Sequence, residues 1–102
     1  MGYFHLKLVS PRPTFPFDIS EAEGKAMAEH ADYWRRLAVE GLAVAVGPVF
    51  DPAGPWGMAV VETENEAEAE ALGAADPIIE AALGFRWEFA PMPSLILREP
   101  KD

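Results

Sequence analysis

Residues 42–64, LAVAVGPVFDPAGPWGMAVVETE, decide the fold because they resemble two valine-rich strands joined by a turn. Short runs rich in valine at 42–50 and 57–64 are typical of strands, and the Pro and Gly residues between them mark a turn. These two segments are therefore predicted to pair as a hairpin. Alanine and valine alternate in the first run, so neither side of it is polar enough to face water. We expect a second copy of the chain to cover one sheet face, which gives a two-fold homodimer.

A helix is predicted before this hairpin, over residues 21–40. Ser20 and Glu23 have the spacing of a capping box at its start, and Gly41 offers a stop. The helix has an apolar stripe and an opposite charged face, which we interpret as solvated. The stripe consists of Met27, Ala31, Trp34, Leu37 and Ala38, and the charged face carries Lys25, Glu29, Asp32, Arg36 and Glu40. His30 falls at the spacing of the stripe, so its side chain is predicted to point inward.

The rest of the chain completes an alternating pattern of strands and helices. In chain order it contains a first strand at 2–9, a proline-rich loop at 9–19, a helical region at 66–83 interrupted at AADP, a fourth strand at 85–92 and a C-terminal tail at 93–102. The order strand, helix, strand, strand, helix, strand predicts an α+β fold of the ferredoxin-like βαββαβ type, with both helices on one face of an antiparallel sheet. A chain of 102 residues suits a single domain over residues 1–102.

The charge balance limits the partners. The chain has 17 Asp and Glu residues against 8 Lys and Arg residues, a net charge of -9, and no basic cluster beyond Arg35 and Arg36. It therefore lacks the basic surface that nucleic acids or anionic membranes require. No apolar run approaches the roughly 20 residues that cross a bilayer, and the N-terminus has no signal-peptide pattern. We expect a cytoplasmic protein whose partners are itself and a small-molecule ligand.

Several chemistries are disfavoured by the residues that are missing. The chain has no cysteine, so disulfides, thiolate metal sites and a thiol nucleophile are excluded. No serine lies in a nucleophile-elbow motif, which disfavours a covalent serine intermediate. The two histidines have no nearby ligand cluster, so we expect no metal, and no axial-ligand pattern singles out either one for haem. No cofactor is expected.

Three residues are candidates for substrate binding. Arg12, in the proline-rich loop, could bind an anionic group through its guanidinium, or it could simply be solvated. His5 could line the interior of a barrel or lie at an interface between chains. Trp56, in the turn of the hairpin, has no core position and could cover a pocket mouth or a partner chain, whereas Trp34 and Trp87 have core spacing and are interpreted as packing residues.

Several short motifs in one order carry a family resemblance. His30 is followed eleven positions later by Gly41 and then by AVGPV, with GAADP downstream and a last strand that ends in APM. This arrangement resembles the YCII-related (YciI-like) protein family over residues 3 to about 92. The resemblance implies a dimeric α+β barrel, in which two ferredoxin-like protomers place their sheets face to face. It also implies a catalytic pair of a His on the first helix and an Asp in the DP step, which correspond to His30 and Asp76.

Such a pair is suited to acid/base chemistry. A carboxylate on one ring nitrogen orients the imidazole and leaves the other nitrogen free to move a proton. The implied function is a lyase or isomerase that acts on a small organic acid or lactone. The alternative is a non-catalytic dimeric module that binds a metabolite. In that case His30 is a hydrogen-bonded core residue, and Asp76, which precedes Pro77, is only a helix cap. If the pair is real, the two side chains should open into one cleft within hydrogen-bond reach.

Overall fold

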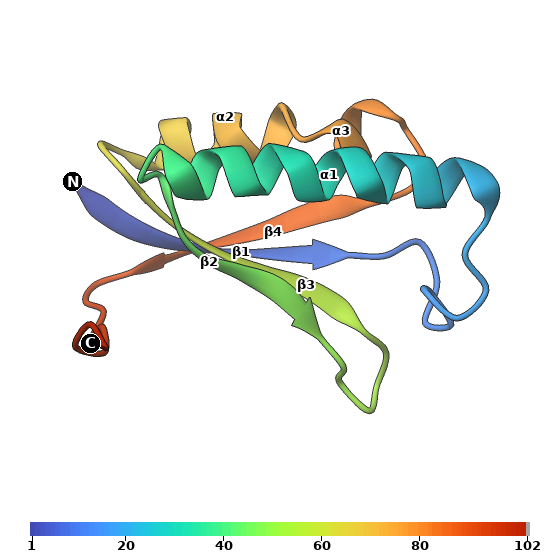
Figure 1. The fold of residues 1–102 in the computed structure, drawn as a ribbon, viewed down its shortest axis with the longest axis horizontal. Helices are drawn as coiled ribbons and strands as arrows, with labels where there is room; N and C mark the ends of the chain where they lie inside the picture. The colour runs from blue at the N-terminus through green and yellow to red at the C-terminus, as the bar shows by residue number, and fades with distance from the viewer. Residues whose placement is uncertain (102) are drawn as a thin grey trace.

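A computed structural model describes residues 1–101 (Figure 1). One antiparallel sheet has the strand order β2-β3-β1-β4. Its strands are β1 (Gly2–Val9), β2 (Ala43–Val49), β3 (Trp56–Thr63) and β4 (Arg86–Met92). The helices α1 (Glu21–Val39), α2 (Glu66–Ala74) and α3 (Pro77–Glu80) all lie on one face of the sheet (Figure 1). This is the ferredoxin-like βαββαβ protomer from which dimeric α+β barrels are built, as the order of elements predicts.

Helix α1 begins and ends where the sequence signals place its termini. The Ser20 hydroxyl accepts a hydrogen bond from the backbone N–H of Glu23 at 3.2 Å, and the Glu23 carboxylate accepts one from the Ser20 N–H at 2.9 Å. The predicted capping box is therefore present. After the helix, Gly41 adopts a φ of +85°, a left-handed conformation that glycine accepts without strain.

The predicted hairpin of β2 and β3 is confirmed, but its alternation contains one irregularity. The register shifts between Ala43 and Ala45, so that Ala43 lies opposite Val61 while Val46 lies opposite Ala59. Simple alternation would place Ala43 and Ala45 on the same side. The irregularity, typical of a β-bulge, instead places Ala43 on the helix side together with Val46.

The predicted helical region at 66–83 consists of two helices. Helix α2 ends at Ala74, and α3 begins at Pro77, so the break falls at the AADP step. Asp76 is the N-cap of α3, where its side chain accepts a hydrogen bond from the Ile78 N–H at 2.9 Å. Gly73 at the end of α2 allows a close approach to β4, because a Cβ atom there would lie 2.9 Å from Cδ1 of Trp87.

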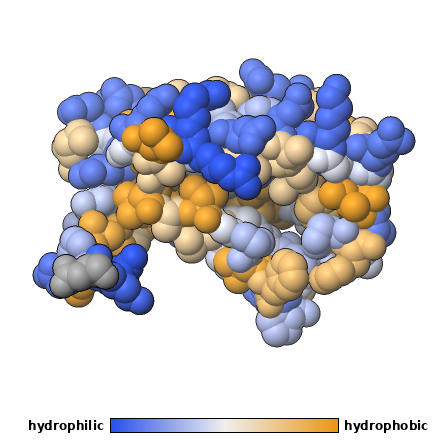
Figure 2. Space-filling view, in the orientation of Figure 1, coloured by the Kyte–Doolittle hydropathy of each residue, from blue (hydrophilic) through white to orange (hydrophobic). Residues whose placement is uncertain are grey.

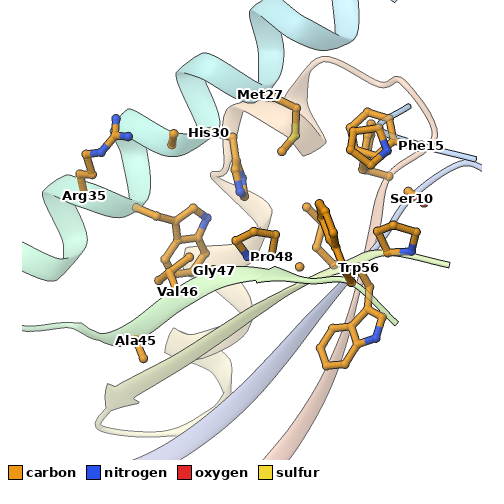
Figure 3. A pocket seen from close by; sticks show the side chains of 18 of the residues that line it. Ser10, Phe15, Met27, His30, Arg35, Ala45, Val46, Gly47, Pro48 and Trp56 are labelled. Carbon is orange, nitrogen blue, oxygen red and sulfur yellow. The ribbon is translucent and has the colours of Figure 1, made fainter. Parts of the chain in front are cut away.

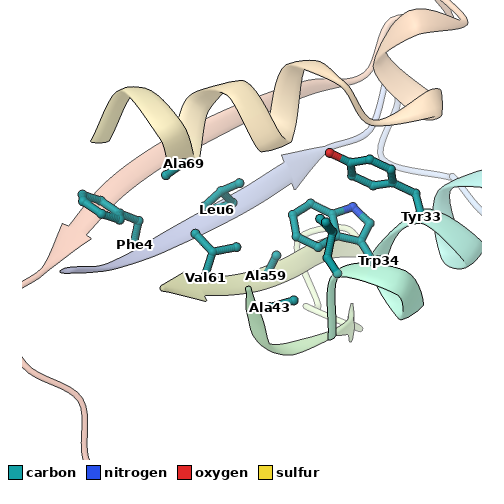
Figure 4. Close-up of a cluster of buried hydrophobic side chains, with 9 residues drawn as sticks. Phe4, Leu6, Tyr33, Trp34, Ala43, Ala59, Val61 and Ala69 are labelled. Atoms are coloured by element: carbon teal, nitrogen blue, oxygen red, sulfur yellow. The ribbon is translucent and has the colours of Figure 1, made fainter. Parts of the chain in front are cut away.

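The core lies between the helices and the sheet and consists of two clusters. The larger cluster (Figure 4) contains Phe4, Leu6, Tyr33, Trp34, Leu37, Ala43, Ala59, Val61 and Ala69. The smaller contains Leu8, Phe15, Ala26, Ile78 and Phe85. Trp34 is a core residue, and Trp87 packs against both clusters, as predicted for these two indoles. Burying this apolar surface is the main favourable contribution to folding.

The sheet face away from the helices is open. Because Phe4, Leu6 and Leu8 of β1 are buried on the helix side, the alternating residues Tyr3, His5 and Lys7 lie on the open face. Charged and apolar side chains are mixed there, so this face is more polar than the valine-rich hairpin alone suggests.

Among the described residues, no helix is long and apolar enough to cross a membrane. The tail from residue 94 to 101 contains neither helix nor strand.

Candidate functional site

A cavity of about 740 Å³ lies between α1 and β2, and the proline-rich loop and the turn of the hairpin complete its walls (Figure 3). Its lining is mainly apolar and includes Leu8, Phe15, Met27, Trp34, Pro48 and Phe85. The apolar stripe of α1 is therefore divided, because Leu37 packs in the core while Met27, Ala31 and Ala38 line the cavity. Figure 2 shows hydrophobic side chains along the junction of helices and sheet, below the hydrophilic outer surface of the helices.

His30 is a polar side chain in this apolar wall. Its ring extends from α1 into the cavity toward Pro48 (Figure 3), and its side chain is 13% exposed. Nδ1 lies 2.6 Å from Oδ2 of Asp76, 46 residues further along the chain. The inward orientation of His30 is confirmed. The two side chains lie within direct hydrogen-bond distance, although only His30 lines the cavity, with Asp76 behind it.

The surroundings of Asp76 favour Nδ1 as the ring nitrogen of His30 that carries a proton. Asp76 is fully buried, and its Oδ2 also accepts a hydrogen bond from Nε1 of Trp34 at 2.7 Å, while Oδ1 accepts from the Ile78 N–H. An indole N–H and a backbone N–H can only donate, so both carboxylate oxygens act as acceptors. An ionised Asp76 with Nδ1–H of His30 as its third donor satisfies every group. This arrangement leaves Nε2 of His30 as the free, basic nitrogen.

Two further hydrogen bonds hold the chain segment just before Asp76. The Tyr33 hydroxyl donates to the carbonyl oxygen of Leu72 at 2.6 Å, and Nε1 of Trp87 donates to that of Gly73 at 3.0 Å. Burial, with a smaller contribution from the negative charge of Asp76, raises the pKa of Tyr33. The phenol therefore stays protonated and able to donate. Aromatic side chains of α1 and β4 thus fix the end of α2 and, through it, the position of Asp76.

The structure does not bring Arg12 to His30. The guanidinium binds both carboxylate oxygens of Glu23 at 2.7 Å and Oδ2 of Asp18 at 2.9 Å. These contacts raise its own pKa and clamp the proline-rich loop to the start of α1. Arg12 lines a separate, shallow hollow of about 290 Å³ beside Lys7 and Trp56. The guanidinium is therefore already bound by carboxylates of the protein itself. The position of Arg12 between prolines in the sequence does not indicate these partners.

The Arg12–Glu23 contact predicts a pH-dependent part of the stability. The hydrogen bond from Arg12 is the largest cause that lowers the pKa of Glu23 from 4.5 to about 2. Because the folded-state pKa lies below the unfolded one, the stabilisation is complete above about pH 4.5 and is lost as the pH falls toward 2. We expect Glu23→Gln, which can still cap the Ser20 N–H, to lower the melting temperature at pH 7. The difference from the wild type should disappear near pH 2.

Thermal unfolding monitored by circular dichroism across this pH range checks the expectation. The control repeats the Glu23→Gln substitution in an Arg12→Met background, where the pH-dependent difference should be much smaller because its charged partner is gone. A melting-temperature difference that stays constant from pH 7 to 2 would show that Arg12 and Glu23 do not stabilise the fold as an ion pair.

His5 and Trp56 lie on the other side of the sheet from His30. The backbone of Trp56 borders the cavity, but its indole points away from His30 (Figure 3). The indole contacts His5 edge-on, with 6.1 Å between ring centroids, and lies under Nζ of Lys7 at 4.9 Å. Its Nε1 donates to Oδ2 of Asp51 at 3.1 Å. His5 and Trp56 therefore form a group of their own on the open sheet face.

Two residues at the cavity were not recognised as candidates from the sequence. Trp34 was interpreted as packing alone, yet its indole N–H binds Asp76. Its position four residues after His30 on the same helix face could have indicated a shared partner. Arg35 lines the cavity but was counted only as part of a basic pair. Within residues 1–101, no cluster of three His, Cys, Asp or Glu side chains is arranged to hold a metal ion.

Comparisons with known proteins agree with this architecture. Among solved structures, the uncharacterized protein TM1266 from Thermotoga maritima is 14% identical, with a TM-score of 0.50 over 88% of this chain and 94% of that chain. The 5-chloro-2-hydroxyhydroquinone dehydrochlorinase TftG from Burkholderia phenoliruptrix AC1100, in complex with 2,5-dihydroxybenzoquinone, is 19% identical, with a TM-score of 0.54 over 83% of this chain and 90% of that chain. At these identities the likeness concerns the fold alone.

A family model, by contrast, relates this chain to known proteins by its amino-acid sequence. No curated protein matches the chain in sequence. The model of the YCII-related domain, however, matches residues 4–93, which is most of the 102 residues. The chain therefore belongs to the YCII-related domain family.

Proposed function

We propose that this protein is a lyase or isomerase that removes a proton from a small, largely apolar organic acid or lactone, with His30 as the general base and Asp76 as its positioning residue. The observation that carries the proposal is the 2.6 Å contact between Nδ1 of His30 and Oδ2 of Asp76, combined with the opening of the same imidazole into an apolar cavity. A base held in one tautomer beside a ligand-sized space is the minimum that proton abstraction requires.

The proposed reaction begins with transfer of a substrate proton to Nε2 of His30. The proton comes from a carbon next to a carbonyl group, and the electron pair of the broken C–H bond moves toward that carbonyl or expels a leaving group. The buried carboxylate of Asp76 stabilises the imidazolium that forms. The mainly apolar wall lowers the local polarity and so strengthens this electrostatic interaction. Return of the proton to another carbon completes an isomerisation, whereas loss of the leaving group completes an elimination.

The fold shared with TftG is compatible with this reaction class but assigns neither a reaction nor a substrate to this chain. TftG is a dehydrochlorinase, so its reaction is an elimination, and its structure contains a dihydroxybenzoquinone. A ring of this kind is compatible in size with the cavity beside His30, since small-molecule pockets commonly measure about 300–1,000 Å³. The mainly apolar lining also favours a compound with an apolar or aromatic body.

A two-step screen tests the proposal. First, small carboxylic acids and lactones are tested for a rise in melting temperature, since a ligand that binds only the folded state stabilises it. Second, each stabilising compound is incubated with the protein in deuterium oxide, and proton NMR follows the loss of the C–H signal next to its carbonyl. We expect at least one compound to exchange or react with the wild type. Compounds that bind equally well to His30→Ala and never exchange would instead support the metabolite-binding module.

We also propose that a second copy of the chain covers the open sheet face. The support is that no helix of residues 1–101 lies on that face, together with the row of Ala45, Val60 and His5, which are register neighbours across β2, β3 and β1. Sedimentation velocity at micromolar concentration should give the mass of two chains. Ala45→Glu should yield a folded monomer, because it places a charge in the interface at a residue that is exposed in the single chain.

Val39→Glu, at a side chain that is 89% exposed on α1, is the matched control and should remain dimeric. Circular dichroism confirms that both variants fold. A wild type that stays monomeric at these concentrations would exclude the dimer.

A further inference from the structure

We propose that Arg35 binds the carboxylate of the ligand at the mouth of the His30 cavity, so that the ligand is a small acid with an apolar body. This inference rests on the proposed role of the cavity and narrows its substrate class. It differs from the expectation that Arg12 provides the anion site.

The charges around the cavity single out Arg35. Among the described residues that line it, Arg35 is the only lysine or arginine, and none is an aspartate or glutamate. His30 and Ser10 also line the cavity with polar side chains. The Ser10 hydroxyl, however, already donates a hydrogen bond to the carbonyl oxygen of Arg12 at 2.9 Å. The protein has a net charge of -9, so an anionic ligand is repelled at long range and needs a cation nearby.

The guanidinium of Arg35 is available to a ligand, unlike that of Arg12. Within residues 1–101 its single ion pair is with Asp32 at 3.1 Å, and the two side chains are 75% and 80% exposed. Such an exposed pair contributes little to stability and is easily exchanged for another carboxylate. Figure 3 places Arg35 on α1 at one end of the cavity, with the guanidinium directed outward. Rotation of its exposed side chain would direct the two donors of the planar group toward a carboxylate in the mouth.

The spacing of Arg35 and His30 defines the shape of the ligand. Five residues along an α-helix correspond to a rise of about 7.5 Å and to directions that differ by roughly 140°, a difference that the long Arg35 side chain would have to span. A carboxylate held by Arg35 would therefore lie about one substituted ring away from an atom that reacts with Nε2 of His30. The charged end would stay in water at the mouth, and the apolar body would enter the space between α1 and β2. Arg35 would thus select the ligand and set its direction relative to the base.

The test compares two probes of equal shape, 3-phenylpropionate and its neutral amide. Their dissociation constants are measured through the NMR signals of the His30 imidazole. The wild type should bind the acid about tenfold more tightly than the amide, since a hydrogen bond to a charged group is stronger than a neutral one. Arg35→Gln should abolish this preference and leave the affinity for the amide unchanged.

Arg36→Gln is the matched control. Arg36 is adjacent in sequence, but it does not line the cavity, and its guanidinium lies over the Tyr33 ring at 5.4 Å. The control should keep the preference for the acid. If the amide binds but the acid has no advantage, or if the advantage persists in Arg35→Gln or is equally lost in Arg36→Gln, the role of Arg35 is wrong while the cavity stands. If neither probe perturbs His30 in the wild type, both the ligand class and the role of the cavity are wrong.

Discussion

Replacement of Asp76 by alanine is expected to lower the free energy of unfolding by roughly 3–5 kcal/mol, the usual effect of removing one partner from a buried charged network. The substitution removes the acceptor of the Trp34 indole N–H and of the Ile78 N–H, and it removes the N-cap of α3. Both donors would remain buried without a partner, and neither can accept a hydrogen bond instead. Urea unfolding at one fixed protein concentration measures the loss.

Asp76→Asn separates the charge from the shape. If the amide oxygen takes the place of Oδ2, the amide NH2 faces the Ile78 N–H; if it takes the place of Oδ1, the NH2 faces the Trp34 indole N–H. In either orientation two donors meet, so we expect a smaller loss of roughly 1–3 kcal/mol. The NMR signals of the His30 ring nitrogens should also change, because the acceptor of Nδ1–H is altered.

Asp51 provides a matched control for both substitutions. Its carboxylate also accepts one backbone N–H, from Ala53, and one indole N–H, from Trp56, but it lies in the partly exposed turn of the hairpin. Asp51→Ala should therefore cost clearly less than Asp76→Ala, since water can replace the lost acceptor. Equal losses at the two positions would show that burial of Asp76 is not what makes it important. An unchanged His30 signal in Asp76→Asn would show that Asp76 serves only as a cap.

His30→Asn is expected to reduce turnover by about 10²–10⁴-fold, the usual contribution of a positioned general base. The amide nitrogen of asparagine can occupy the position of Nδ1 and keep the hydrogen bond to Asp76, but the variant has no counterpart of Nε2. The substitution therefore removes the base and preserves the buried network. The measurement is the turnover number for a substrate identified by deuterium exchange. Stability should change far less than in Asp76→Ala.

His5→Asn is the matched control for this prediction, because it removes the other imidazole of the chain. His5 lies on the open sheet face beside Trp56, on the opposite side of the sheet from the cavity. Its loss should leave turnover within a few-fold of the wild type. If the two variants lose activity equally, or if His30→Asn keeps full activity, His30 is not the base.

The tryptophan side chains lie on opposite faces of the sheet. Trp34 and Trp87 have their indole N–H groups directed at Asp76 and Gly73 on the helix side, whereas Trp56 lies on the other face with Lys7. Substitutions on the helix side should therefore affect the His30 site. Those on the open face should affect association of the protein, if the face is an interface.

The sequence alone was sufficient for the order and the bounds of most elements. The capping box of Ser20 and Glu23, the turn residues of the hairpin and the alternation of β1 are local patterns, and each is read from a few neighbouring residues. His30 and Asp76 were also found from the sequence, but through the family resemblance, since no local rule links two residues that are 46 positions apart.

The tertiary structure alone decided what the polar side chains contact. Arg12 was a plausible ligand for an anion until the loop placed it between Asp18 and Glu23, and Trp56 could have faced either side of the sheet until the register of β3 was known. The roles of Trp34 and Arg35 likewise depend on how α1 packs against α3 and β2. Periodicity determines the face on which a side chain lies, whereas the partner that it meets there comes from a distant segment, whose position depends on the packing of the whole fold.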